Sequence, residues 1–248
     1  MLKLEHIAWE LPDGEEIIRD IDLTVGNQKM VVVTGPNGGG KTTLAKLIAG
    51  IKTPASGRIL LDGEDITEAD VTERAKKGIA YAFQQPVKFK GLTVRDLLEL
   101  ASGGELDHDG ICGLLGNVGL CAEEYIDREM SASLSGGESK RIEIASVLAR
   151  GAKLSIFDEP EAGIDLWSFT RLVETFQELQ REQKGTLLVI SHQERILSIA
   201  DEIVVIADGR VRAAGPREEV LPTLLSEERT MRCPQGRCSQ GKEGVCHE

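Results

Sequence analysis

The stretch Gly35-Pro36-Asn37-Gly38-Gly39-Gly40-Lys41-Thr42 decides the fold of this chain. It follows an apolar run, residues 30–33, and opens a helical pattern, so the order is strand, glycine-rich loop and helix. The glycines let successive backbone N–H groups point at one anion, and the helix N-terminus adds partial positive charge behind them. The spacing predicts a loop that binds the phosphates of ATP, with Lys41 on the β- and γ-phosphates and Thr42 on Mg²⁺. Thr43 is expected to contact the nucleotide beside them.

Composition narrows the class of protein further. The chain has 248 residues, of which 41% are hydrophobic and only 4% aromatic, so its core must consist mainly of aliphatic side chains. The net charge is −12 and no basic cluster is visible, which predicts that nucleic acid is not a partner. The chain contains no apolar run of about 18 residues and no signal-peptide pattern, so we expect a cytoplasmic protein without membrane insertion.

Strands and helices alternate along most of the chain. Strands are expected at 2–11, 17–25, 30–33, 58–63, 78–83, 153–159, 186–191, 202–207 and 210–214, and helices at 93–101, 136–150 and 166–183. This alternation predicts an α/β fold with a mainly parallel sheet that is covered on both sides. We expect one domain over residues 1–230, with a small helical subdomain at about 90–148, and a separate cysteine-rich tail at 231–248.

Two carboxylates follow the apolar strand that begins near residue 153. Asp158 and Glu159 come at its carboxyl end, where open α/β sheets place their ligands. Asp158 is expected to hold Mg²⁺ and Glu159 to act as the general base that polarises the attacking water. The alternative is a solvated pair that caps a helix before Pro160.

A second anion site is predicted at Leu134-Ser135-Gly136-Gly137-Glu138, which lies directly before a helix. It is remote in sequence from the first loop, so the two surfaces suggest ATP shared between two protomers. The alternative is an N-capped helix with a flexible entry.

The chain resembles the ATP-binding cassette (ABC) ATPases over roughly residues 1–225, with motifs in the family's order. The matches are Gly35–Thr42 with Walker A, Gln84 with the Q-loop, Leu134–Glu138 with the signature, Leu154–Glu159 with Walker B, Ala162–Asp165 with the D-loop, and His192 with the switch histidine. This resemblance implies a P-loop, RecA-like core with N-terminal antiparallel strands and a helical subdomain. It implies an ATP-dependent head-to-tail homodimer, in which the signature of one subunit meets the nucleotide on Walker A of the other.

The resemblance also implies roles for single residues. Gln84 would ligate Mg²⁺ and take part in catalysis with Lys41, His192 would contact the γ-phosphate, and Asp165 would contact the shared nucleotide. Members of the family usually stack adenine on an aromatic residue at the position of Leu11. We therefore expect either Leu11 or Trp9, two residues earlier, to contact adenine. Our interpretation is that Trp9 belongs to the core.

Three local stretches are similar to SufC, the ATPase of the SUF iron–sulphur cluster assembly machinery. They are Ala82–Val87 followed by Gly91-Leu92, then Ala162–Asp165, and Ser191–Leu197. This similarity implies a scaffold of the SufB/SufD type as the partner, docked beside Gln84. The alternative, with the same chemistry, is the nucleotide-binding subunit of an importer docked on a membrane permease, and Pro160 is typical of transporters.

The cysteines fall into two groups. Cys233, Cys238, Cys246 and His247 in the tail could bind Zn²⁺ or an iron–sulphur cluster, although their spacing matches no standard site, and a flexible reduced tail is the alternative. Cys112 and Cys121, in the helical segments, are expected to be buried thiols.

Overall fold

The computed structural model describes residues 1–87, 89–130 and 134–231, with the side chains of the last helix described as far as Ser226. The strands are β1 Leu2–Glu10, β2 Glu16–Val25, β3 Met30–Thr34, β4 Ser56–Leu61, β5 Glu64–Asp65, β6 Ile79–Ala82, β7 Leu154–Asp158, β8 Thr186–Ile190, β9 Glu202–Ala207 and β10 Arg210–Pro216. The helices are α1 Lys41–Ile48, α2 Val71–Lys76, α3 Val94–Ser102, α4 His108–Asn117, α5 Ala122–Tyr125, α6 Gly136–Ala149, α7 Leu166–Arg181, α8 Glu194–Leu197 and α9 Arg217–Met231.

The strands form two sheets. Four pair antiparallel in the order β2-β1-β4-β5, and six pair in the order β10-β9-β3-β8-β7-β6. In the second sheet the strands from β9 to β6 run parallel, and β10 is an antiparallel edge strand. The predicted α/β cassette, with N-terminal antiparallel strands and a mainly parallel sheet, is therefore confirmed.

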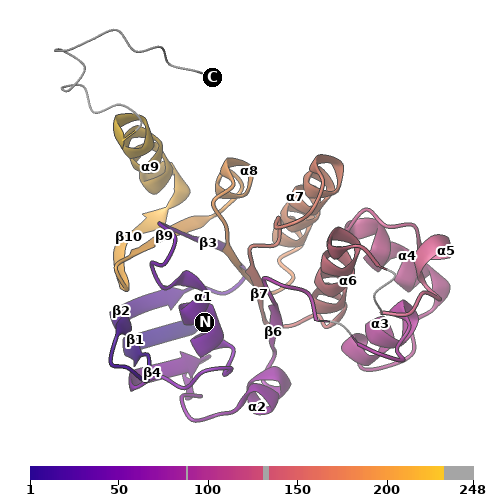
Figure 1. The fold of residues 1–248 in the computed structure, drawn as a ribbon, viewed down its shortest axis with the longest axis horizontal. Helices are drawn as coiled ribbons and strands as arrows, with labels where there is room; N and C mark the ends of the chain where they lie inside the picture. Colours follow the sequence, from indigo (N-terminus) through magenta and orange to yellow (C-terminus); the bar gives the residue numbers. More distant parts are fainter. Residues whose placement is uncertain (88, 131–133, 232–248) are drawn as a thin grey trace, which may run out of the picture.

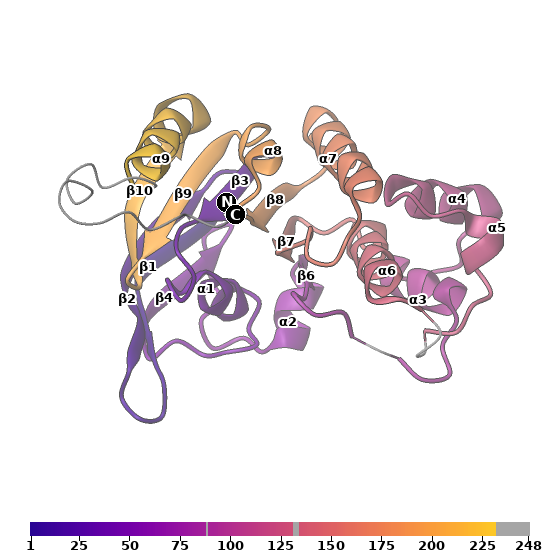
Figure 2. The same ribbon diagram turned by 45° about the horizontal axis from the view of Figure 1, so that its top comes forward.

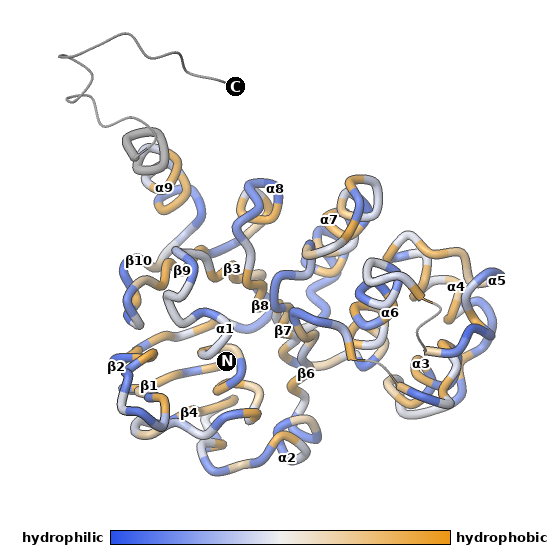
Figure 3. Tube along the Cα trace, in the orientation of Figure 1, coloured by the Kyte–Doolittle hydropathy of each residue, from blue (hydrophilic) through white to orange (hydrophobic). Residues whose placement is uncertain are grey.

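The central strands are apolar because helices and the other sheet cover both of their faces. Every residue of β3, β7 and β8 is buried, and these strands carry the hydrophobic colours in Figure 3. Continuous apolar runs of this kind are typical of parallel sheets with two covered faces. The strand before the glycine-rich loop, β3, lies between β9 and β8, so the loop emerges near the middle of the sheet.

Two hydrophobic cores lie on the two sides of the parallel sheet. One lies between the two sheets and around α1, and the other joins the opposite face of the parallel sheet to helices α3 to α9. Helices α3 to α6 gather at one end of the molecule, away from β1, β2 and β4 (Figures 1 and 2). Thr93 caps α3 in a capping box with Asp96.

Some elements differ from the sequence analysis. The helix α9 continues to Met231, whereas no helix is predicted there, because Pro222 and an acidic first turn weaken its apolar pattern. Cys112 is half-buried and Cys121 is exposed, so the prediction of buried thiols is wrong. Cys121 is the N-cap residue of the four-residue helix α5, outside the helix itself. In the described part of the chain, no helix is long and apolar enough to cross a membrane.

Candidate nucleotide site

A hollow of about 670 Å³ opens at the carboxyl ends of β3, β7 and β8. It brings the start of α1 together with residues from distant parts of the chain, as open α/β sheets do at this edge. It is lined by Trp9, Leu11, Ile17, Asn37, Gly38, Gly40, Lys41, Thr42, Thr43, Lys52, Gln84, Glu159 and His192. Each of the predicted Walker A, Q-loop, Walker B and switch motifs thus contributes at least one residue to this hollow.

The glycine-rich loop takes its shape from close backbone packing. Gly35 has φ +130°, and a Cβ there would lie 2.0 Å from the carbonyl oxygen of Ile206. Gly40 has φ +102° and is the N-cap of α1; a Cβ there would lie 2.7 Å from Cδ1 of Ile18. Only glycine fits at these two positions. The first residues of α1, whose N–H groups have no partner inside the helix, line the hollow.

Lys41 carries the positive charge of the loop. Its ammonium group donates to the carbonyl oxygens of Gly35 and Pro36, each at 2.8 Å, and only 6% of the residue is exposed. Burial lowers the pKa of Lys41, and the carboxylates of Glu159 and Asp158 oppose that effect. The loop, the helix terminus and this ammonium group together fit the phosphates of a nucleotide.

Asp158 is fully buried at the end of β7 and is held by two hydroxyl groups. Thr42 Oγ1 donates to its Oδ1 at 3.0 Å, and the Tyr81 hydroxyl donates to its Oδ2 at 2.9 Å. Burial raises the pKa of Asp158, while these hydrogen bonds act against that rise; burial and the nearby Asp158 charge raise the pKa of Tyr81. A threonine hydroxyl beside a carboxylate is an all-oxygen donor set of the kind that fits Mg²⁺.

Tyr81 is a site residue that the sequence analysis missed. It lies on β6, between buried alanines, and the phenol tip is the single polar side chain on that strand. That polar tip in an apolar strand was the available signal.

Glu159 directly follows Asp158 and adopts an unusual backbone conformation. Its φ is +46°, which is rare for a residue with a side chain, and its N–H bonds to the carbonyl of Ile190. Such strain is typical of functional sites. The side-chain amide of Gln84 donates to Oε2 of Glu159 at 2.7 Å.

The predicted signature residues lie elsewhere. Ser135, Gly136, Gly137 and Glu138 begin α6 and are not among the residues that line the hollow. Ser135 and Glu138 form a capping box, and hydrogen bonds from the Tyr125 hydroxyl and from Ser135 lower the pKa of Glu138 to about 2.

The signature segment lies against the predicted D-loop of the same chain. A Cβ on Gly137 would lie 2.7 Å from the carbonyl oxygen of Gly163. Asp165 is not a lining residue of the hollow; it caps α7 by accepting from the N–H groups of Trp167 and Ser168, each at 3.0 Å. Within one chain, therefore, these two motifs adjoin each other and not the phosphate loop.

Trp9 and Leu11 both line the hollow, so Trp9 borders the site as well as the core that was predicted for it. Trp9 packs against the core from the side but stays half-buried. Register shifts in the pairing of β1 with β2 lie on both sides of Trp9, and such irregularities bend a strand locally. The ammonium group of Lys52 lies 3.5 Å from the centre of the indole ring, a cation–π contact, and Ile17 completes this apolar corner.

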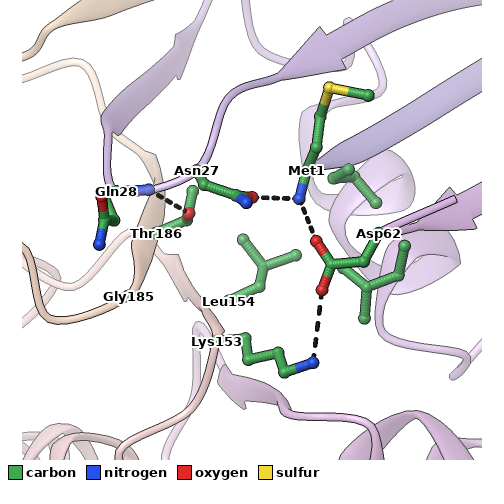
Figure 4. A pocket seen from close by; sticks show the side chains of 10 residues that line it. Met1, Asn27, Gln28, Asp62, Lys153, Leu154, Gly185 and Thr186 are labelled. Atoms are coloured by element: carbon green, nitrogen blue, oxygen red, sulfur yellow. Dashed lines mark hydrogen bonds and ion pairs between the residues drawn. The ribbon is translucent and has the colours of Figure 1, made fainter.

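A second hollow, of about 370 Å³, lies at the amino ends of β7 and β8, and Figure 4 shows the residues that line it. Its polar groups bond to one another. The amino group of Met1 bonds to Asn27 and Asp62, Lys153 reaches Asp62 at 3.3 Å, and the N–H of Gln28 donates to Thr186. It has no glycine-rich loop, so the nucleotide belongs to the larger hollow.

Comparison with known proteins agrees with this geometry. The ABC transporter family model matches residues 18–162. The chain is 38% identical over 215 residues to the "Uncharacterized ABC transporter ATP-binding protein MJ0035" of Methanocaldococcus jannaschii, covering 84% of this chain and 86% of the relative. It is 33% identical to the "Glycine betaine/carnitine/choline transport ATP-binding protein OpuCA" of Bacillus subtilis, covering 92% of this chain but only 60% of the relative.

Among solved structures, the ATP-binding cassette MJ0796, a dimer bound to ADP and Pi, has the same fold. The TM-score is 0.79 at 22% identity, covering 88% of this chain and 99% of that one. The class defined by the fold and the site is the ATP-hydrolysing cassette. The chain belongs to the ABC transporter family and is an ABC-type ATPase.

Proposed function

We propose that this chain is the ATP-hydrolysing subunit of an ABC system, and that it closes with a second copy on ATP and pulls on a docked partner. The observation that carries the proposal is that Lys41, Thr42, Gln84 and Glu159 line one hollow, with the buried Asp158 hydrogen-bonded to Thr42. Each is a chemical part that ATP hydrolysis needs: a phosphate-binding cation, an oxygen site for Mg²⁺, and a base for water.

The chemistry follows from the positions of these side chains. Thr42 and Asp158, with Gln84, would hold Mg²⁺, which neutralises charge that develops on the phosphates. Lys41 would leave its carbonyl partners for the β- and γ-phosphates. Glu159 would orient water for in-line attack and accept its proton, and His192, on the same hollow, would bond the γ-phosphate.

A head-to-tail dimer would account for the position of the signature. Residues 135–138 have the geometry of a helix N-terminus with an N-cap serine but lie away from the phosphate loop of their own chain. In a dimer they would complete the nucleotide site of the other subunit, with Asp165 beside them. The ATP-binding cassette MJ0796, which has the same fold, is dimeric in its state bound to ADP and Pi, which supports a nucleotide-bound dimer here.

The partner would dock on an apolar groove of about 240 Å³ between α1, α2, β6, α3 and α6. Ile51 and Val71 line the groove and are 39% and 51% exposed; Phe83, one residue before Gln84, lines it too. Val87 and Phe89 lie nearby in sequence and are 40% and 38% exposed. A partner bound on this surface would contact the segment that carries Gln84. A change in the position of Gln84 on nucleotide binding would therefore reach the partner.

A membrane permease is the partner that the comparisons favour, because the relatives are named as ATP-binding proteins of transporters. A second candidate is a soluble SUF-type scaffold of the SufB/SufD kind. What supports it is local sequence: Ala82–Val87 beside the groove, the glycine at 163, and Arg195-Ile196-Leu197. The relatives named above give it no support, and both candidates use the same surface.

The experiment that separates the candidates is co-purification from native cells with the partner identified by mass spectrometry, followed by ATPase assays with the purified partner. A permease that binds this chain and accelerates its ATP hydrolysis supports the hypothesis that the chain serves a transporter. A soluble scaffold that does both supports the second candidate. Val87→Asp with Phe89→Asp should abolish either association, whereas Ala213→Asp with Ala214→Asp, on the exposed strand β10, should leave it intact. Loss of ATP binding in the first pair would contradict a docking role.

The tail does not enter the proposed function. Cys233, Cys238, Cys246 and His247 lie outside the described residues, and none of the relatives named above supports a zinc or iron–sulphur site. Elemental analysis of anaerobically purified protein, with Cys233→Ser and Cys238→Ser as the comparison, tests that prediction directly.

A further inference from the structure

Lys140 is buried on α6 and binds main-chain atoms of the nucleotide site. Its side chain is 1% exposed. Its ammonium group donates to the carbonyl oxygens of Phe83, of Gln84 at 3.4 Å and of Asp158 at 3.4 Å. A buried ammonium group requires such acceptors. One side chain on α6 therefore joins the segment after β6 to the end of β7, the two places that supply Gln84 and Glu159.

Glu143 lies one turn further along α6 and holds the same segment. Its Oε1 accepts the N–H of Phe83 at 3.0 Å, so α6 binds both the N–H and the C=O of Phe83. Its Oε2 lies 3.7 Å from Nζ of Lys140 and has no hydrogen-bond partner among the described residues. Burial raises the pKa of Glu143 to about 7, with Lys140 opposing the rise.

Burying Lys140 and Glu143 together costs more free energy than a purely structural contact requires. Two buried ionisable groups lose hydration, and an apolar pair of similar size often gives equal or higher stability. Here the two groups bind the backbone of Phe83 more closely than they bind each other, since their own separation of 3.7 Å is longer than a hydrogen bond. Their arrangement therefore serves the position of Phe83 and of the glutamine that follows it.

The same helix begins at the signature. Ser135 caps α6, and Lys140 and Glu143 lie within its first eight residues. A helix is stiff over this length, so a shift of its first turn moves both side chains with it. We infer that Lys140 and Glu143 are positioning residues: they transmit engagement of the signature by the other subunit's nucleotide to Gln84 and Glu159 of their own chain, through Phe83. This inference rests on the proposed head-to-tail dimer and links its two ATP sites.

The test compares three variants with wild-type protein. Glu143→Ala removes the acceptor of the Phe83 N–H, and kcat should fall by about 10-fold to 10²-fold, because small misplacements of reacting groups have effects of that size. KM for ATP should change less than about twofold, since the phosphate loop is untouched. Glu143→Gln keeps an acceptor oxygen and should recover most of the turnover. The control is Thr175→Val on α7, whose buried hydroxyl donates to the carbonyl of Asn117 at 2.6 Å; kcat should stay near wild type.

The dimer provides the second readout. With Glu159→Gln in the same chain, Glu143→Ala should still form the ATP-dependent dimer in light scattering, because signature and phosphate loop are intact. Wild-type turnover in Glu143→Ala, beside an inactive Glu159→Gln, would overturn this inference and leave the proposed function standing. Loss of the dimer in Glu143→Ala, or a fall in kcat equal to that of Thr175→Val, would also overturn it. Full turnover in Glu159→Gln would instead contradict the proposed function.

Discussion

The side-chain amide of Gln84 donates to Oε2 of Glu159 at 2.7 Å, so the segment after β6 orients the carboxylate at the end of β7. The two residues are far apart in sequence, and parallel pairing of β6 with β7 brings them together. Because the amide nitrogen is the donor, the amide oxygen of Gln84 stays available for the Mg²⁺ ligation expected of it, so one side chain can orient the carboxylate and hold the metal.

Replacing Gln84 tests this relationship. Gln84→Ala should lower kcat by about 10-fold or more, since the base and the metal both lose an orienting group, and should raise the Mg²⁺ concentration at half-maximal rate. Steady-state assays with Mg²⁺ titration measure both quantities. Gln85→Ala, at the exposed neighbouring position, is the matched control. If the two variants behaved alike, Gln84 would have no special role.

The dimer model predicts a specific loss at the signature. In the Glu159→Gln background, ATP should convert the protein to a dimer, measured by light scattering at several protein concentrations. Adding Ser135→Arg should abolish the dimer, because the larger side chain would collide with phosphates at the N-terminus of α6. Ser102→Arg, at the end of α3, provides the control for added charge. An ATP-dependent dimer that survives Ser135→Arg would rule out the shared site.

Recognition of the base should depend on Trp9. Its indole ring borders the hollow and now carries the ammonium group of Lys52 on its face. Trp9→Ala should weaken ATP binding by about 10-fold, in line with the effect of removing an aromatic stacking partner, and Leu11→Ala should have a smaller effect. Titration with fluorescent ATP and GTP analogues measures both. If Leu11→Ala has the larger effect, the aliphatic side chain is the base contact.

The sequence predicted the parts of the fold that depend on local pattern. The glycine-rich loop and the buried strands β3, β7 and β8 follow from spacing and apolar runs. The residues that support the site were missed because their partners are distant in sequence: Tyr81 meets Asp158, 77 positions away, and Glu143 meets Phe83, 60 positions away. Patterns of local sequence, which span only a few residues, cannot reveal contacts over such separations.

Other differences have physical causes of the same kind. The side of the sheet on which Trp9 lies depends on irregular pairing in β1. The alternation of polar and apolar residues along the strand does not reveal that irregularity. Helix α9 packs through few apolar positions on β9 and β10, so its periodicity is weak. Tertiary contacts, and not local propensity, determine the position of Trp9 and the formation of α9.

Arg74 offers a test of stability. The side chain is 1% exposed, and its guanidinium group donates to the carbonyls of Leu47 and Ile48 at the end of α1, and to those of Ala69 and Thr67. Arg74→Met should lower the free energy of unfolding by about 3 kcal/mol, because it leaves buried carbonyls without donors. Urea denaturation measures this change.

The comparison for Arg74→Met is Arg212→Met, which breaks an exposed ion pair with Asp208 and should cost less than about 1 kcal/mol. Equal effects in the two variants would mean that the carbonyl contacts of Arg74 add nothing to stability.

The most direct measurement of the central claim is the steady-state ATPase rate of Glu159→Gln, together with its nucleotide affinity. The variant keeps the size and hydrogen bonding of the side chain but removes the base. We predict that turnover falls by about 10²-fold or more while ATP still binds with near wild-type affinity. Wild-type turnover in Glu159→Gln would contradict the assignment of Glu159 as the base and the mechanism built on it.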